Sequence, residues 1–317
     1  MTSPMPDLPL PTPDLRTDLA GLSLPNPVMT ASGCAAAGRE LDQFFDVSEL
    51  GAIVTKSIMR NPRSGRPTPR MAETPSGMLN SIGLQGPGID SFLANDLPWL
   101  VQRGARAIVS IAGEAPAEFS ELARRVGNAP GVAAIEVNIS CPNVENRGLV
   151  FACDPMQSSH VIEQVRREVP RDLPIFAKLT PDVTNIATIA GAVMEAGADG
   201  VTMINTLLGM TIDPDTLRPK LGGVTGGLSG PAIRPVAVRA VWQVHQAMPD
   251  VPIIGVGGIR TGFDALEFIL AGATAVQIGT VIFNDPSAPM RIVDELRNEL
   301  ASRGLERITD MRGQAHG

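Results

Sequence analysis

The stretch that decides the fold is PIIGVGGIRTGFDALEFILAGATAVQIGT, residues 252–280. Two short apolar runs rich in β-branched residues, 252–258 and 275–280, enclose a segment with the apolar spacing of a helix at 263–270. Continuous apolar strands are typical of parallel sheets that are covered on both faces. The stretch therefore predicts two parallel strands joined by a helix.

The same rhythm extends over most of the chain. Further strands are predicted at 26–32, 51–56, 106–112, 133–139, 174–179 and 200–205, and further helices at 115–127, 155–168, 184–196, 232–247 and 288–302. Eight strands that alternate with helices favour a closed (β/α)8 TIM barrel over an open sheet, and 317 residues suit one such barrel with insertions. We expect a flexible tail over 1–14 and a single barrel domain over 15–317.

Three insertions interrupt this rhythm. Residues 57–98, rich in proline and glycine, follow the second predicted strand, residues 144–154 follow the fourth, and the turn-rich residues 207–230 follow the sixth. Long ordered loops in a compact domain usually carry function. We therefore expect these insertions to help form a binding site.

Composition excludes several classes of function. The net charge of −7 argues against a nucleic-acid partner, and no run approaches the roughly 18 apolar residues of a membrane span. The N-terminus lacks a basic segment followed by an apolar one, so we expect no signal peptide, no membrane contact and a cytoplasmic location. Cys34, Cys141 and Cys153 are the three cysteines, too few for a four-thiolate iron–sulfur site.

Polar residues gather where the predicted strands end. Catalytic groups of TIM barrels lie at the carboxyl ends of the strands. Lys56, Asn138, Lys178 and Asn205 stand at four of these ends, although lysines at element ends are mostly surface residues and asparagines often only form turns. We expect the two lysines to place positive charge near a bound anion and the amides to bind a planar heterocycle.

Glycines follow the last two predicted strands. Gly257 and Gly258 end the seventh strand, and Gly279 with Thr280 ends the eighth. These glycines could simply form tight turns between strand and helix. Glycine also lets backbone N–H groups approach an anion, and the loops after strands seven and eight often hold a phosphate in this fold. We therefore favour a phosphate site there.

A cysteine stands in VNISCPN, residues 137–143, where the fourth predicted strand becomes a loop. A general base works best when its pKa lies near the working pH. The ordinary pKa of a thiol is about 8.5, and neighbouring cations lower it toward neutral pH. We interpret Cys141 as a catalytic base, against the alternative of a buried structural cysteine. Cys34 and Cys153 are interpreted as packing or incidental residues.

These motifs, taken together, resemble a known family. NISCPN, LNSIGLQGPG, AKLTPDVT, DGVTMINT, TGGLSGPAI, GVGGI and AVQIGT occur in order between about residues 16 and 300 and resemble the dihydroorotate dehydrogenases, FMN enzymes of pyrimidine synthesis. Cys141 resembles the base of their soluble class. Within it, the chain is most similar to the catalytic subunit of the NAD-linked type 1B, which pairs with a subunit that carries FAD and a [2Fe-2S] cluster. The other soluble type is a homodimer that reduces fumarate.

The resemblance implies roles for individual residues. Cys141 would take the proton from C5 of dihydroorotate, and the C6 hydride would pass to N5 of FMN. The substrate and its product orotate would be held by Lys56, Asn80, Ile82, Gly83, Leu84, Asn138, Asn143, Asn205 and Thr206. FMN would be bound by Ala31, Ser32, Lys56, Asn138, Lys178, Ile204, Gly230, Gly257, Gly258, Gly279 and Thr280. No metal ligand is implied, and the assembly would be a homodimer or a heterotetramer with the electron-transfer subunit.

Two alternatives differ in function. A dihydropyrimidine dehydrogenase-like enzyme shares the S-C-P and AKLTP-like segments but acts on a substrate without a carboxylate. A catalytically silent flavoprotein subunit would serve only as a scaffold or electron relay for a partner. The segments Met203-Ile204-Asn205-Thr206 and LNSIGLQ favour dihydroorotate over a dihydropyrimidine. Intact Cys141, Lys56 and the asparagines argue against a catalytically silent subunit.

Overall fold

The computed structural model describes residues 12–139 and 151–317. Its centre is a sheet of eight parallel strands in the order β3-β14-β13-β10-β9-β8-β7-β4. The two outer strands meet as well, because Gly51 N donates to Val28 O at 2.8 Å and Val54 N donates to Thr30 Oγ1 at 3.0 Å. The strands are β3 (Val28–Thr30), β4 (Ile53–Val54), β7 (Ala107–Ile111), β8 (Val132–Asn138), β9 (Ile175–Leu179), β10 (Gly200–Met203), β13 (Ile253–Val256) and β14 (Ala275–Ile278).

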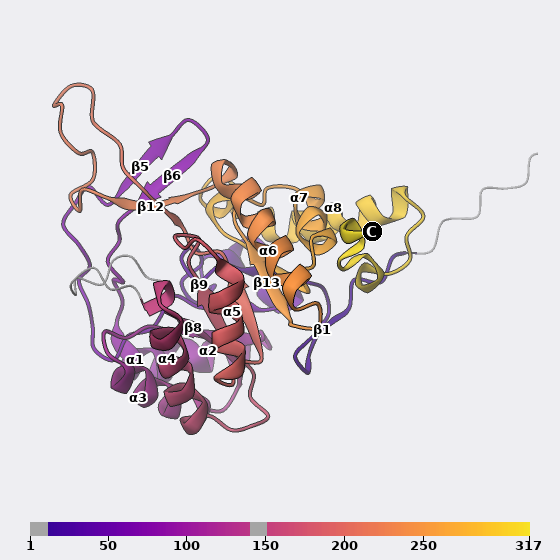
Figure 1. Cartoon of the computed structure of the whole chain (residues 1–317), viewed down its shortest axis with the longest axis horizontal. Coiled ribbons are helices and arrows are strands. Elements are labelled where there is room, and N and C mark those ends of the chain that lie inside the picture. Colours follow the sequence, from indigo (N-terminus) through magenta and orange to yellow (C-terminus); the bar gives the residue numbers. More distant parts are fainter. Residues whose placement is uncertain (1–11, 140–150) are drawn as a thin grey trace, which may run out of the picture.

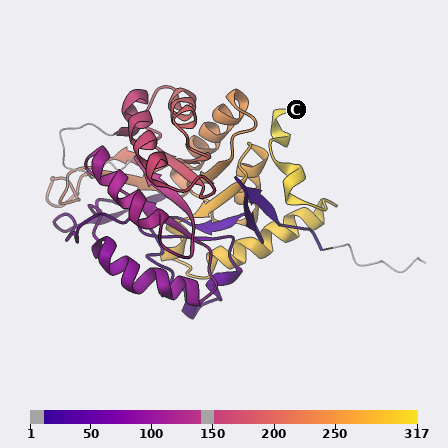
Figure 2. The same ribbon diagram turned by 90° about the horizontal axis from the view of Figure 1, so that it is seen from below.

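Helices surround these strands, as the view at right angles to Figure 1 shows (Figure 2). The long ones are α3 (Pro116–Gly127), α4 (Pro155–Glu168), α5 (Ile186–Glu195), α6 (Arg234–Ala247), α7 (Gly262–Leu270) and α8 (Ala288–Ser302). The predicted TIM barrel is thus confirmed, with all eight strands and all six helices at the expected places. None of the helices in the described part of the chain is long and apolar enough to cross a membrane.

Local sequence explains where the helices begin and which face they bury. Asp154 caps α4 by accepting from the backbone N–H groups of Met156 and Gln157, and Thr261 with Asp264 forms a capping box on α7. In α3 the buried residues are Phe119, Leu122, Ala123 and Val126, which recur every three to four positions and face the strands. Burying each large side chain of this kind contributes about 1.5–3 kcal/mol.

The two long insertions meet in a second sheet. β5 (Met71–Thr74) and β6 (Gly77–Asn80) form a hairpin between β4 and β7, and β11 (Leu207–Gly209) and β12 (Gly226–Ser229) lie between β10 and β13. The four strands form an antiparallel sheet in the order β11-β12-β6-β5, set to one side of the barrel (Figure 1). The first insertion then continues through α1 (Gly88–Ser91), the π-helical turn η3 (Phe92–Asp96) and α2 (Leu97–Gln102).

Short elements complete the fold at its ends. β1 (Thr17–Leu19) and β2 (Leu22–Leu24) form an N-terminal hairpin. Single 3-10 turns are η1 (Leu41–Gln43), η2 (Val47–Glu49), η4 (Phe151–Cys153), η5 (Pro231–Ile233), η6 (Thr280–Phe283), η7 (Ile308–Met311) and η8 (Gln314–His316). Asp14, the last residue of the predicted tail, pairs with the segment before η7: its N–H donates to Glu306 O and its carbonyl accepts from Ile308 N. Asp14 is thus paired with the C-terminal part of the chain through its backbone.

Candidate active site

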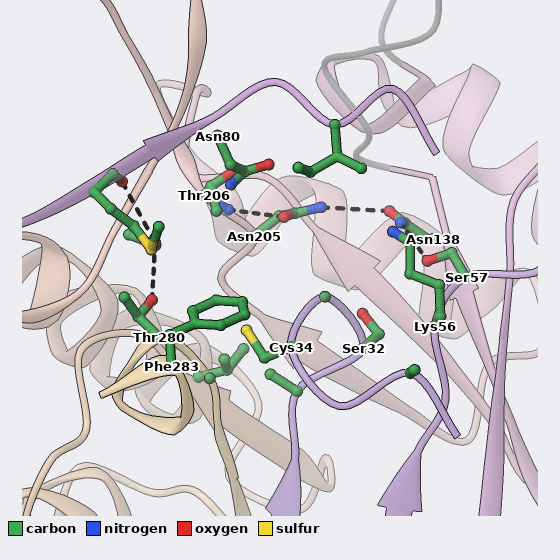
Figure 3. A pocket seen from close by; sticks show the side chains of 18 of the residues that line it. Ser32, Cys34, Lys56, Ser57, Asn80, Asn138, Asn205, Thr206, Thr280 and Phe283 are labelled. Carbon is green, nitrogen blue, oxygen red and sulfur yellow. Dashed lines mark hydrogen bonds between the residues drawn. The ribbon is translucent and has the colours of Figure 1, made fainter. Parts of the chain in front are cut away.

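A cavity of about 960 Å³ opens at the carboxyl ends of the barrel strands, between the barrel and the antiparallel sheet. Both insertions contribute to its wall, through Asn80 at the end of β6 and through Thr206 and Ser229 beside β11 and β12. Of the residues predicted to bind ligand, the cavity is lined by Ala31, Ser32, Lys56, Asn80, Ile82, Leu84, Asn138, Lys178, Ile204, Asn205, Thr206, Gly230, Gly257, Gly258, Gly279 and Thr280. Figure 3 shows ten labelled side chains around it.

A chain of side-chain hydrogen bonds holds the amides at one side of this cavity (Figure 3). The hydroxyls of Ser110 and Ser57 are 3.0 Å apart, and Asn138 Nδ2 donates to Ser57 Oγ at 3.0 Å. Asn205 Nδ2 donates in turn to Asn138 Oδ1 at 3.4 Å, while Asn205 Oδ1 accepts from Thr206 N at 2.8 Å. The two amides are thereby oriented before any ligand binds, which suits the recognition of a planar, hydrogen-bonding ring.

The end of β6 and the segment after it supply another part of the wall. Asn80 Nδ2 donates to Gly227 O at 3.3 Å, which ties the first insertion to the second. Ile82 and Leu84 line the cavity, but Gly83 between them is not among the described lining residues. Gly83 turns toward Arg63, whose Nε donates to its carbonyl at 3.0 Å. Its part in substrate binding stays a prediction.

The glycines after β13 and β14 form a tight backbone cradle. Gly258 has a φ of +72°, and a Cβ there would come within 2.6 Å of Gly230 O. Among the described residues, the amide N–H groups of Gly257, Gly258, Gly279 and Thr280 donate to no carbonyl in the turns and loops. Backbone without side chains lets an anion approach closely, and the phosphate site at this position stays a prediction.

The two lysines reach the cavity from different strands. Lys56 follows β4 and is partly exposed, and Lys178 on β9 is 4% exposed. Lys178 Nζ lies 3.3 Å from both Ser32 Oγ and Gln277 Oε1, and 3.5 Å from Glu136 Oε1. The cavity thus has a cationic side that suits an anionic or electron-rich ligand.

Cys34 also lines the cavity, although the sequence suggested only a packing role. Burial raises the pKa of its thiol to about 11, and the nearby charges of Lys178 and Lys56 only partly oppose this. The thiol is therefore neutral at physiological pH and unsuited to act as a base there. Cys153, in contrast, is exposed and is not among the described lining residues.

Two predicted site residues, Cys141 and Asn143, lie outside the described residues. Ser57, Glu136 and Gln277 are polar groups in and below the cavity that sequence reasoning did not assign. Ser57 directly follows Lys56 at a strand end, so its place in the sequence was a usable signal. Glu136 was detectable as the one charged residue within the largely apolar run AAIEVNI, whereas nothing local marks Gln277.

The chain is also similar in sequence to known proteins. A family model described as dihydroorotate dehydrogenase matches residues 14–300. A protein of Pelobacter propionicus named dihydroorotate dehydrogenase B (NAD(+)), catalytic subunit, is 50% identical over 301 residues, which cover 95% of this chain and 98% of the relative. A protein of the same name from Geotalea daltonii has the same identity and coverage. Another, from Desulforudis audaxviator, is 50% identical over 94% of this chain and 96% of the relative.

Proposed function

The chain belongs to the dihydroorotate dehydrogenase family, and from this premise we propose that it oxidises dihydroorotate to orotate in pyrimidine biosynthesis. The observation that carries the proposal is the cavity, in which pre-oriented amides, two lysines and a glycine cradle face one space. A dihydropyrimidine ring with a carboxylate needs amide partners and a cation, and the cavity has both.

The same residues support FMN as the cofactor. The cradle at Gly257, Gly258, Gly279 and Thr280 would hold the phosphate, and Lys178 with Ser32 would lie against the ring system. When bound, FMN would supply the acceptor for the hydride that leaves C6 of the substrate. Ala31, Ile204 and Gly230 line the same space.

The proton chemistry belongs to the chain itself. We propose that the Cys141 thiolate removes the C5 proton, and that Lys56 and the amides of Asn80, Asn138, Asn143 and Asn205 orient the ring and its carboxylate. Cys34 is not a competing base because its pKa is about 11. A substrate held in this way loses its proton and hydride from adjacent carbons without moving within the site.

A partner protein would take the electrons onward. The relatives are named as NAD(+)-dependent catalytic subunits, and three cysteines cannot form a four-thiolate cluster in this chain. We propose a heterotetramer of two copies of this chain with two subunits that carry FAD and [2Fe-2S], located in the cytoplasm. Exposed apolar side chains on and beside the antiparallel sheet, Met71, Leu208, Met210 and Ile212, support an interface there.

A substrate panel tests the proposed function. The chain is assayed with an artificial dye as electron acceptor, once with dihydroorotate and once with dihydrouracil, which lacks the carboxylate. We expect turnover of dihydroorotate alone. Turnover of dihydrouracil without turnover of dihydroorotate would contradict the proposed substrate, and flavin binding without any turnover would favour the silent-subunit alternative.

The acceptor is tested separately. Fumarate and NAD are offered to the chain alone and to the chain mixed with its electron-transfer subunit. We expect NAD reduction only in the mixture. Efficient fumarate reduction by the chain alone would instead place it with the fumarate-reducing homodimers.

A further inference from the structure

A charged cluster lies beneath the floor of the cavity, inside the barrel. Glu136 on β8, Lys178 on β9 and Gln277 on β14 are 0%, 4% and 1% exposed. Gln277 Nε2 donates to Glu136 Oε2 at 2.7 Å, and Gln277 Oε1 accepts from Lys178 Nζ at 3.3 Å. The second carboxylate oxygen, Oε1, lies 3.5 Å from Lys178 Nζ and has no hydrogen-bond partner in the described part of the chain.

The strands place the three residues in layers. Asn138 and Lys178 are partners across β8 and β9, and both line the cavity. Glu136 precedes Asn138 by two positions, so it points to the same side of β8 but lies one layer deeper. Glu136 is not among the described lining residues. It therefore acts on a ligand only through Lys178 and through its electric field.

Stability alone does not explain this arrangement. A buried ion pair is often no more stable than apolar side chains of similar volume, because both ions must leave water. Within residues 12–139 and 151–317, one oxygen of Glu136 has no hydrogen bond, which adds to that cost. The side-chain amide of Gln277 hydrogen-bonds both the Lys178 ammonium and the Glu136 carboxylate. The ammonium is thereby held on the cavity side of the carboxylate.

We propose that Glu136 is a positioning residue of the flavin site: it holds the Lys178 ammonium at the cavity floor and offsets part of its charge, and so lowers the midpoint potential of the bound FMN. The inference rests on the proposed function, because it requires FMN in this cavity. The carboxylate of Glu136 lies 3.5 Å from the Lys178 ammonium, and Lys178 lines the cavity. Glu136 is thus the anion placed to compensate Lys178.

The test is the midpoint potential of bound FMN in wild type and in Glu136→Gln, measured by reduction against a reference dye. The substitution keeps the size of the side chain and removes its charge. We expect the potential to rise, so that the affinity for reduced over oxidised FMN increases roughly tenfold, the scale of one charge in a buried site. Thr202→Val is the matched control: Thr202 is buried, is the partner of Lys178 across β9 and β10, and carries no charge. It should leave the potential unchanged.

A second measurement tests the ion pair even if Glu136→Gln does not fold. Removing one member of a buried pair leaves an uncompensated charge, whereas removing both does not. The double variant Glu136→Gln, Lys178→Met should therefore resist chemical denaturation better than Glu136→Gln alone, in the absence of flavin. Additive losses, or a double variant that also fails to fold, would contradict the pairing.

The outcomes separate this inference from the proposed function. Wild-type protein that binds no FMN would contradict the proposed function, while the denaturation series would still report on the pair. Wild-type protein that binds FMN, combined with an unchanged potential in Glu136→Gln, would contradict the inference alone.

Discussion

The cavity contains thiol, amide and ammonium groups whose surroundings differ. Cys34 sits in apolar surroundings that keep its thiol protonated, whereas Ser57 orients the amide of Asn138 and Gln277 orients the ammonium of Lys178. Each polar side chain of the floor is thus held by another side chain. Such support keeps functional groups in place before substrate binds, which reduces the entropy lost on binding.

Replacing Cys141 by alanine tests the assignment of the base. Cys141→Ala should keep FMN bound and reduce the rate of flavin reduction by dihydroorotate at least about 100-fold at neutral pH, the usual contribution of a positioned base. Stopped-flow absorbance of the flavin measures this rate. Cys153→Ala is the matched control, because Cys153 is exposed and only weakly bonded to Asp182 O. Wild-type rates in Cys141→Ala would refute the role.

The pH profile identifies which thiol acts. A thiol must be ionised to accept a proton, so the rate rises with pH and levels off above the pKa of the base. If Cys34 were the base, the rate would still rise at pH 10, since its pKa is about 11. We expect the reduction rate of wild type to level off well below that pH.

At the scale of elements, the turn after β13 decides whether the cradle can form. Gly258→Ala would place a Cβ 2.6 Å from Gly230 O at a φ of +72°. We expect FMN affinity to fall roughly 5- to 150-fold, as strain of about 1–3 kcal/mol would produce. Fluorescence titration of FMN measures this affinity. Gly191→Ala on α5 is the matched control, because no heavy atom lies within 4 Å of its Cβ position. Equal affinity in both variants would contradict the cradle.

The C-terminal turns dock on α6 through a cluster of rings. Trp242 and His316 stack at 3.6 Å between ring centroids, and His245 meets His316 at 4.8 Å. Burial lowers the pKa of His245 from its ordinary value of 6.5, and the charges of Arg312 and His316 lower it further, against a smaller opposite effect of Asp250. The folded chain therefore favours the neutral form of His245 more than the unfolded chain does.

This lowered pKa predicts a loss of stability in acid. The unfolded chain binds a proton at His245 near pH 6.5, whereas the folded chain does so only at lower pH, so stability falls as pH drops below 6.5. His245→Phe keeps a ring and should lose this part of the pH dependence in urea unfolding. His160→Phe, at an exposed position on α4, is the control and should behave as wild type. Identical pH dependence in all three proteins would contradict the assignment.

At the scale of the whole molecule, the barrel was predictable and the second sheet was not. Each strand of the barrel is a short, largely apolar run and each long helix has its own apolar spacing, so both signals are local. The pairing of Leu228 on β12 with Leu79 on β6 joins segments about 150 residues apart, and strands this short leave no local pattern that names their partner.

The candidate site divides in the same way. Lys56, Asn138, Lys178 and Asn205 could be found because the carboxyl ends of all barrel strands meet at one edge. The residues that hold Lys178 in place could not be found from the sequence. Glu136 and Gln277 meet only because β8 and β14 face each other across the barrel interior, which no sequence spacing encodes.

The most direct test of the central claim is a visible spectrum of the purified chain, recorded before and after dihydroorotate is added without oxygen. The account predicts a flavin spectrum that bleaches, because substrate oxidation and flavin reduction occur within this chain and need no partner. A flavin spectrum that stays unchanged with dihydroorotate, in protein that dithionite still reduces, would contradict the account.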